Sequence, residues 1–309
     1  MAPKALCCIS VDIDAVCGWL GSYGGEDSVS DISRGYFAGT VGVRRLLDLF
    51  AKYNIKTTWF IPGHSLETFP EECALIRDAG HEIGLHGYSH ENPKEMTIEQ
   101  QRVVLDKTYR LLTDFCGKPP RGSVVPWWET PNEGAELMME YGLEYDHSFS
   151  HHDALPYWLR VGDKWTNIDY SKHPDTWMKP LERGETTGLV EIPASWYMFI
   201  KNMANSHGWV HPNVVEDLWR DHFDYFYETY DNFCFPVTIH PDVCGHPHAL
   251  KMLERIIKYL LTKEGVEFVK MEDICDEFKS RNTPPEGARL PAEVGAKLKE
   301  YQRKQPLDT

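Results

Sequence analysis

The sequence has little positive charge. Its 309 residues include 32 lysines and arginines against 47 aspartates and glutamates, which gives a formal net charge of −15. Nucleic acids and anionic membrane surfaces are bound through basic faces. The charge balance therefore argues against either as the main partner and is typical of a soluble intracellular protein.

Long apolar runs are also missing. No stretch approaches the roughly 20 apolar residues that a membrane-spanning helix needs. The apolar run at the N-terminus is short, is interrupted by Asp12 and Asp14, and has no small-residue cleavage site, so it does not resemble a secretory signal. The eight cysteines form no CxxC pair and several lie in apolar runs, which is typical of reduced thiols. We therefore expect a cytoplasmic protein.

Three familiar catalytic patterns are absent. The glycine-rich residues 18–28 lack the Gly-Lys-Ser/Thr ending of a phosphate-binding loop, and acidic residues follow where an anion would lie. There is no Gly-x-Ser-x-Gly elbow. The HExxH metalloprotease pattern is absent too, because His81 and His86 are five residues apart.

The apolar runs that are present alternate with stretches of helical periodicity. This alternation predicts an α/β fold with a parallel sheet, either open or closed into a barrel. Thr97 with Gln100 predicts a capping box, and Thr130 with Pro131 predicts a second helix start. Strands are expected at 5–13, 56–63, 81–87, 122–127, 188–195, 234–241 and 266–271, and amphipathic helices at 213–231 and 248–261.

Two segments lack this regular pattern. Residues 146–187 are irregular and rich in Trp, His, Asp and Pro, so they predict a functional loop or an insertion. From about residue 281 the chain is polar and contains prolines, which indicates a packing arm or a loose end. We expect a single domain over 1–280 and a C-terminal tail over 281–309.

Chemically capable side chains follow several predicted strands. Asp12 and Asp14 are two apart, so in a strand both carboxylates point to the same face. They lie at the strand's carboxyl end, where active sites of parallel α/β folds gather. Two adjacent carboxylates repel each other, and a cation or a shared proton relieves that cost. Alternatively, they are polar residues entering a loop.

Three histidines are placed at the same edge. His86 and His90 follow the third predicted strand, and His240 ends a late one. Two imidazoles and one carboxylate form a common set for Zn²⁺ or Fe²⁺, with positions left for water and substrate. The alternatives are surface imidazoles and a strand-end histidine that bonds a neighbour. With Asp14 as the third ligand, the set predicts a site for zinc or another divalent transition metal.

Tryptophans follow two further strands. Trp127 and Trp128 come directly after Pro126, and Trp196 lies in the similar string EIPASWY. These side chains predict flat apolar walls of a substrate pocket. Core packing is the alternative.

Together these strings resemble the polysaccharide deacetylase (NodB homology, carbohydrate esterase 4) superfamily. The resemblance spans about residues 5–280 and rests on strings such as VDIDAVCGWLGSYGGEDS, DAGHEIGLHGYSHENP, PWWE and TIHPDV. They are most similar to the branch that holds peptidoglycan deacetylase-like proteins, cyclic imidases and allantoinase-like enzymes. The resemblance implies a distorted (β/α)7 barrel and a homotetramer.

The resemblance also implies roles for the site residues. It implies metal ligation by Asp14, His86 and His90, with Asp12 as general base and His240 as general acid. One departure concerns the strand-four motif, where the wider family has an arginine that braces the base and this chain has Val124, Val125 and Pro126. The branch shares that change, which weakens a direct transfer of the polysaccharide substrate.

The sequence is compatible with three alternative functions. The first is metal-dependent hydrolysis of a small intracellular amide, such as a cyclic imide or ureide. The absence of a secretory signal and the bulky tryptophans favour it. The second is N-deacetylation of an N-acetylglucosamine-containing glycan of the peptidoglycan or chitin type. The third is a binding protein with a dead site, which is disfavoured because all five chemical residues are present.

Overall fold

The computed structural model describes residues 2–22, 28–195, 198 and 210–304. Within them the strands form one sheet in the order β6-β7-β5-β4-β3-β2-β1-β8, with β9 pairing with β1. All pairs are parallel except the β6–β7 hairpin. The strands are β1 Lys4–Asp12, β2 Thr58–Ile61, β3 Glu82–Leu85, β4 Gly122–Ser123, β5 Tyr145–Asp146, β6 Tyr157–Val161, β7 Glu185–Glu191, β8 Asn232–Ile239 and β9 Val266–Phe268.

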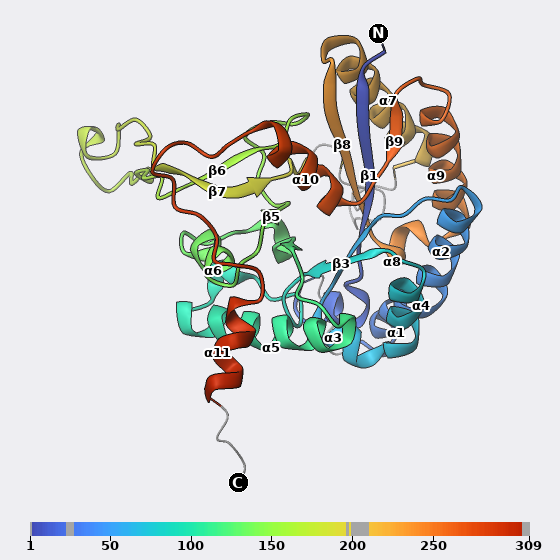
Figure 1. Ribbon diagram of the computed structural model, residues 1–309, viewed down its shortest axis with the longest axis horizontal. Helices are drawn as coiled ribbons and strands as arrows, with labels where there is room; N and C mark the ends of the chain where they lie inside the picture. Colours follow the sequence, from blue (N-terminus) through green and yellow to red (C-terminus); the bar gives the residue numbers. More distant parts are fainter. Residues whose placement is uncertain (1, 23–27, 196–197, 199–209, 305–309) are drawn as a thin grey trace.

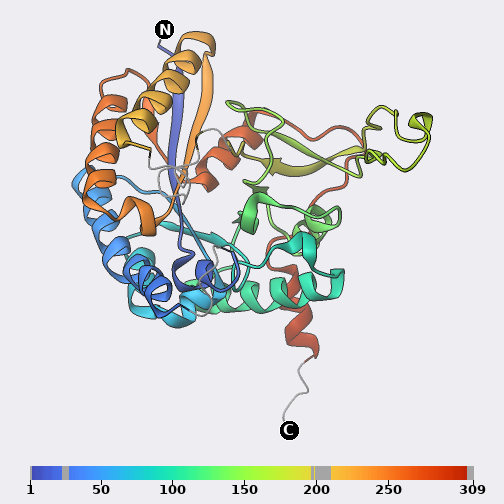
Figure 2. The ribbon, with the colours of Figure 1, turned by 180° about the vertical axis from the view of Figure 1, so that it is seen from behind.

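The sheet curls into a half-barrel, and most helices lie on its outer side (Figures 1 and 2). This arrangement confirms the expected NodB-type barrel fold, with β8 and β6 at the two ends of the hydrogen-bonded path. The helices are α1 Val29–Phe37, α2 Val43–Lys52, α3 Gly63–Thr68, α4 Pro70–Asp78, α5 Ile98–Cys116, α6 Gly134–Glu140, α7 Pro212–Thr229, α8 Pro241–Cys244, α9 Pro247–Leu260, α10 Met271–Arg281 and α11 Ala296–Lys304. None of the described helices is both long and apolar enough to cross a membrane.

The structure confirms one of the two predicted helix starts. The capping box of Thr97 and Gln100 begins α5, because each side chain accepts a bond from the other residue's main-chain N–H. The start predicted at Thr130 and Pro131 is wrong. Residues 131–133 form a turn instead, and α6 begins at Gly134 without a side-chain cap.

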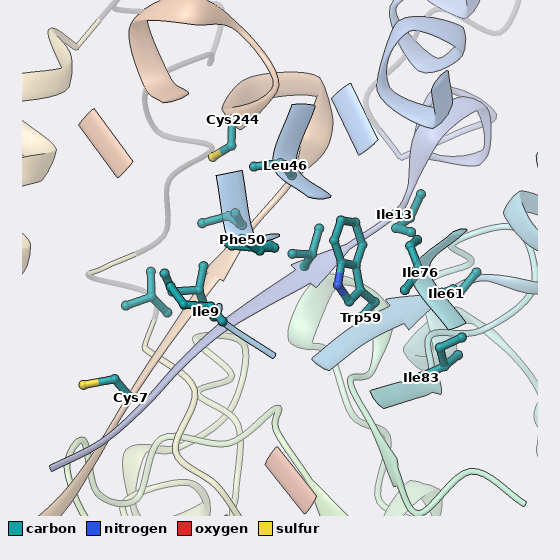
Figure 3. Packing of buried hydrophobic residues seen from close by; sticks show 14 of the residues in the cluster. Cys7, Ile9, Ile13, Leu46, Phe50, Trp59, Ile61, Ile76, Ile83 and Cys244 are labelled. Atoms are coloured by element: carbon teal, nitrogen blue, oxygen red, sulfur yellow. The ribbon is translucent and has the colours of Figure 1, made fainter. Parts of the chain in front are cut away.

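Strand β1 separates two apolar clusters. Alternate residues of β1, such as Cys7 and Ile9, belong to the outer apolar cluster, in which Phe50 of α2 lies near Ile9 (Figure 3). The other face of β1 points into the half-barrel and starts with Leu6 and Cys8. Helix α10 fills this end of the interior with Met271, Ile274 and Cys275. The inner face thus becomes polar only toward the carboxyl end of β1.

The segment 146–187 is more regular than its sequence indicated. It contains the end of β5, all of β6 and the first three residues of β7. The residues between β6 and β7 extend the hairpin far from the body of the molecule and from the carboxyl ends of β1 and β8 (Figure 1). A further bridge pairs Lys164 with Glu182 along this extension.

The C-terminal tail is a packing arm over its described residues. The main-chain N–H of Gly188 in β7 donates to the carbonyl oxygen of Arg289 at 2.9 Å. The N–H of Ala292 donates to the carbonyl oxygen of Met139 in α6 at 2.8 Å. The tail therefore lies along α6 and β7 before it forms α11.

Candidate metal centre

The five predicted polar residues meet at one edge of the sheet. Asp12 is the last residue of β1, and Asp14 follows two residues later. His86 comes directly after β3, and His240 directly after β8. Because these strands are parallel, their carboxyl ends lie at the same edge. With His90, all five side chains are at most 6% exposed.

Asp14, His86 and His90 lie close enough to share one metal ion. One ligand atom from each lies within 4.8 Å of the other two. Nε2 of His86 is 3.2 Å from Oδ1 of Asp14, and Nε2 of His90 is 3.6 Å from Oδ2 of the same carboxylate. Two imidazoles and a carboxylate form a ligand set typical of zinc and other divalent transition metals.

Hydrogen bonds at the far side of each ring set the tautomers. Nδ1 of His86 is 2.7 Å from the carbonyl oxygen of Val124, to which it must donate. Nδ1 of His90 is 2.6 Å from Oγ of Ser22, whose hydroxyl donates to the carbonyl oxygen of His90 at 2.9 Å. Ser22 therefore accepts from Nδ1. Both rings use Nδ1 for these outer bonds and turn Nε2 toward Asp14, as ligating histidines do.

The three residues therefore fit a divalent metal by chemistry and by orientation. Ser22 was not predicted as part of the site. It lies in the glycine-rich segment that was rejected as a phosphate loop, and no spacing in the sequence connects it with His90. Its hydroxyl takes the place that a carboxylate or a main-chain carbonyl occupies beside many metal-bound histidines.

Asp12 and His240 lie beside this ligand set. Nε2 of His240 is 3.7 Å from Oδ2 of Asp12 and 3.5 Å from Oδ2 of Asp14. Oδ2 of Asp12 is also 3.9 Å from Nε2 of His86. A carboxylate and an imidazole in these positions have the chemistry of a general base and a general acid.

The site is electrostatically negative. Burial lowers the pKa of His86, but the charges of Asp12 and Asp14 outweigh burial and raise it to about 9. Burial dominates at His90 and lowers its pKa to about 4, against the opposing charge of Asp14. Two carboxylates in a buried space therefore favour a cation between them.

A strained turn forms one side of the site. The predicted pocket residues Trp127 and Trp128 lie in a 3₁₀ turn, Pro126–Trp128, and have φ values of +67° and +53°. Trp127 is 38% exposed, and its Nε1 donates to the carbonyl oxygen of His90 at 3.2 Å. It therefore lies at the surface beside the ligand set and outside the core. The third predicted pocket residue, Trp196, lies outside the described residues.

The chain resembles known proteins in sequence and structure. The Polysaccharide deacetylase family matches residues 34–146, which include His86 and His90. Peptidoglycan deacetylase of Helicobacter pylori is 53% identical over 289 residues, which is 91% of this chain and 99% of that protein. A peptidoglycan deacetylase-like protein of Gibberella zeae is 41% identical over 87% of this chain and 85% of its own length.

Solved structures agree with this assignment. A Mycobacterium smegmatis protein classed with the polysaccharide deacetylases superposes with a TM-score of 0.77 at 25% identity, over 94% of this chain and 96% of that chain. PuuE allantoinase shares the fold, with a TM-score of 0.72 at 21% identity over 91% and 92%. With a near full-length relative above 50% identity, this chain belongs to the polysaccharide deacetylase (NodB, CE4) family of hydrolases, which act on carbon–nitrogen amide bonds.

Proposed function

We propose that the protein is a metal-dependent N-deacetylase that removes acetyl groups from N-acetylated amino sugars of a glycan. The convergence of Asp14, His86 and His90 beside Asp12 and His240 carries this proposal. The 53% identity to a peptidoglycan deacetylase over nearly the whole of both chains supports the substrate class. Zinc is the metal we expect at the three ligands, because they are two neutral imidazoles and one carboxylate.

The residues divide the chemistry between them. The metal supplies a Lewis acid that polarises an amide oxygen and acidifies water. Asp12 accepts the proton that the attacking water loses. His240 donates a proton to the nitrogen of the leaving amine, which is too basic to depart as an anion. The bond between the carbonyl carbon and nitrogen breaks, and the products are acetate and a free amine.

A small ring amide remains a second candidate substrate. The observation that favours it is the position of Trp127, which is hydrogen-bonded to His90 and extends the strained turn along one side of the site. The sequence alone favoured this class, whereas the relatives with long coverage support the glycan. The likeness to an allantoinase concerns the fold only, at 21% identity.

A substrate panel separates the candidates. Zinc-loaded protein is incubated with N-acetylated chito-oligomers and peptidoglycan fragments, and in parallel with succinimide and allantoin-type ureides. We expect release of acetate and free amine from the oligomers, loss of turnover on chelation, and recovery with added zinc. Ring opening with the oligomers intact would establish the second candidate. No turnover of any substrate by the metal-loaded protein would leave only a binding role.

We also propose self-association and a cytoplasmic location. The resemblance implies a homotetramer, and the projecting hairpin supports contact between copies because it exposes large apolar side chains. These are Trp165, Ile168, Tyr170, Met178 and Leu181. Light scattering should give a mass several times 35.6 kDa, and cell fractionation tests the location. A monomer at micromolar concentration would contradict the proposed self-association.

A further inference from the structure

A layer of buried polar side chains lies next to the proposed catalytic residues, toward the amino ends of β1 and β8. Ser10 of β1 pairs in register with Thr238 of β8. Each is two residues before a site residue, Asp12 or His240, so all four side chains point to the same face of the sheet. Ser10, Thr238 and the nearby His147 are at most 5% exposed. Buried polar groups of this kind require partners.

Their hydrogen bonds form a chain with a defined direction. Nδ1 of His147 is 2.7 Å from the carbonyl oxygen of Ile192, so it must carry the proton. Burial lowers the pKa of His147 to about 4, and the ring is neutral at pH 7 with an unprotonated Nε2. This Nε2 lies 3.0 Å from Oγ1 of Thr238, whose hydroxyl must therefore donate to it. Oγ1 of Thr238 accepts in turn from Ser10 at 3.2 Å.

The chain crosses the open side of the half-barrel. Strand β8 is at one end of the hydrogen-bonded path, and β5 is separated from it by β4, β3, β2 and β1. His147 directly follows β5, and its main-chain N–H donates to Ser123 of β4 at 3.0 Å. The bond from Thr238 to His147 therefore connects β8, the strand directly before His240, to the half of the sheet that carries the tryptophan turn.

His147 also contacts that turn. Its ring lies edge to face with Trp128, with 6.2 Å between ring centroids and 80° between ring planes. Thr238 fixes one edge of the imidazole and Ile192 fixes the other, so the ring has one orientation available to support Trp128. Locked side chains below a site preserve the geometry of the groups above it.

We infer that His147 is a positioning residue, which acts through Thr238 and Trp128 to hold His240 and the pocket wall in register across the open side of the barrel. This inference rests on the proposed hydrolysis. The mechanism itself uses neither His147 nor Thr238. Their contribution is the placement of His240, for which displacements below 1 Å already reduce rates.

Four variants test this role by steady-state kinetics. Thr238→Val removes the donor and keeps the shape, and His147→Phe keeps a ring against Trp128 and removes both hydrogen bonds. Each should lower kcat about tenfold or more with KM nearly unchanged. The double variant should be no worse than either single variant, because both remove the same link. Thr238→Ser should recover most of the activity.

A matched control separates positioning from stability. Thr187 in β7 is also buried, and its hydroxyl donates to the carbonyl oxygen of Leu159 at 2.8 Å. Thr187→Val should lower the melting temperature by a similar amount to Thr238→Val and leave kcat unchanged. Equal losses of kcat in these two variants would assign the effect to stability and would overturn the inference.

The imidazole tautomer gives a readout that needs no turnover. Nitrogen-15 NMR of the wild type should show His147 protonated at Nδ1 and unprotonated at Nε2 at pH 7. A ring protonated at Nε2 would overturn the inference. If the wild type hydrolyses its substrate while Thr238→Val and His147→Phe keep kcat within twofold, the inference fails alone. No turnover by the zinc-loaded wild type would overturn the proposed function and the inference with it.

Discussion

Trp127 and His90 hold each other in strained conformations. The indole Nε1 of Trp127 donates to the carbonyl oxygen of His90 at 3.2 Å, and the two residues have φ values of +67° and +56°. Left-handed conformations of bulky residues cost energy and persist only where neighbours fix them. A predicted pocket residue and a proposed metal ligand thus share one constraint.

Loss of this bond should weaken metal binding. Trp127→Phe keeps an aromatic wall and removes the donor to His90. We expect the zinc Kd to rise about fivefold, which corresponds to the ~1 kcal/mol of one hydrogen bond. Competition with a chromophoric chelator measures it. Trp165→Phe, on the exposed hairpin, is the control. An unchanged Kd in Trp127→Phe would show that the bond does not restrain His90.

Substitution of Ser22 should weaken zinc binding more than substitution of Trp127 does. Its hydroxyl is the hydrogen-bond partner of Nδ1 of His90, and loss of such a partner costs about 10- to 100-fold in metal affinity. We expect Ser22→Ala to raise the zinc Kd within that range, as measured by the same competition. Ser33→Ala removes a hydroxyl on the surface of α1 and should leave the Kd unchanged. Equal Kd values for the two variants would contradict the role of Ser22.

Substitution of Asp12 should abolish turnover, whereas substitution of a metal ligand should abolish metal binding. Asp12→Asn should lower kcat about 10²- to 10⁴-fold, because the base is lost, while the protein still binds one equivalent of zinc. His86→Ala should lose the zinc itself, since only two of the three ligands remain. Metal analysis after gel filtration, together with acetate release, distinguishes the two cases. Full turnover of Asp12→Asn with a confirmed substrate would exclude Asp12 as the base.

The buried carboxyl group of Glu82 should make the protein less stable as the pH rises, as should those of Asp146 and Glu191, whose pKa values burial also raises. Burial, reinforced by the charge of Glu272, raises the pKa of Glu82 to about 7. The folded state therefore binds this proton more tightly than the unfolded state, whose pKa is about 4.3. The contribution to the free energy of unfolding is complete below pH ~4.3 and is lost as the pH rises through 7, by about 4 kcal/mol.

Denaturant unfolding at a series of pH values tests this. The wild type should become less stable between pH 4.5 and 7, and Glu82→Gln should lack that part of the slope. The amide introduced by this substitution keeps one carbonyl oxygen for the hydroxyl of Thr58, which donates to the carboxylate of the wild type at 2.6 Å. The same slope in both proteins would show that Glu82 titrates normally.

Much of the site could be predicted because strand geometry is local. The spacing of Asp12 and Asp14 sets a common face, and parallel strands bring their carboxyl ends to one edge. Strand β5 was missed because it has two residues, too few for any periodicity. Strand β6 was missed because it lies within irregular sequence, and only its pairing with β7 makes it a strand.

Residues that act only through tertiary contacts could not be identified from the sequence. Ser22 and His147 have no partner at a recognisable spacing. His147 is 91 residues from Thr238, and Ser22 is 68 residues from His90. Only the curl of the sheet and the course of the loop after β1 bring these pairs together. The helix start predicted at Thr130 and Pro131 was also wrong, because α6 begins only at Gly134.

The position of β1 has a consequence for biosynthesis. Strand β1 leaves the ribosome long before its neighbour β8, which begins at Asn232. At about 5–20 residues per second, synthesis of the intervening chain takes roughly 10 to 45 s. During that time the edge that will pair with β8 carries the run Ala5–Ile9 without its partner. The newly made chain should therefore depend on chaperones until β8 emerges, and truncated products should aggregate.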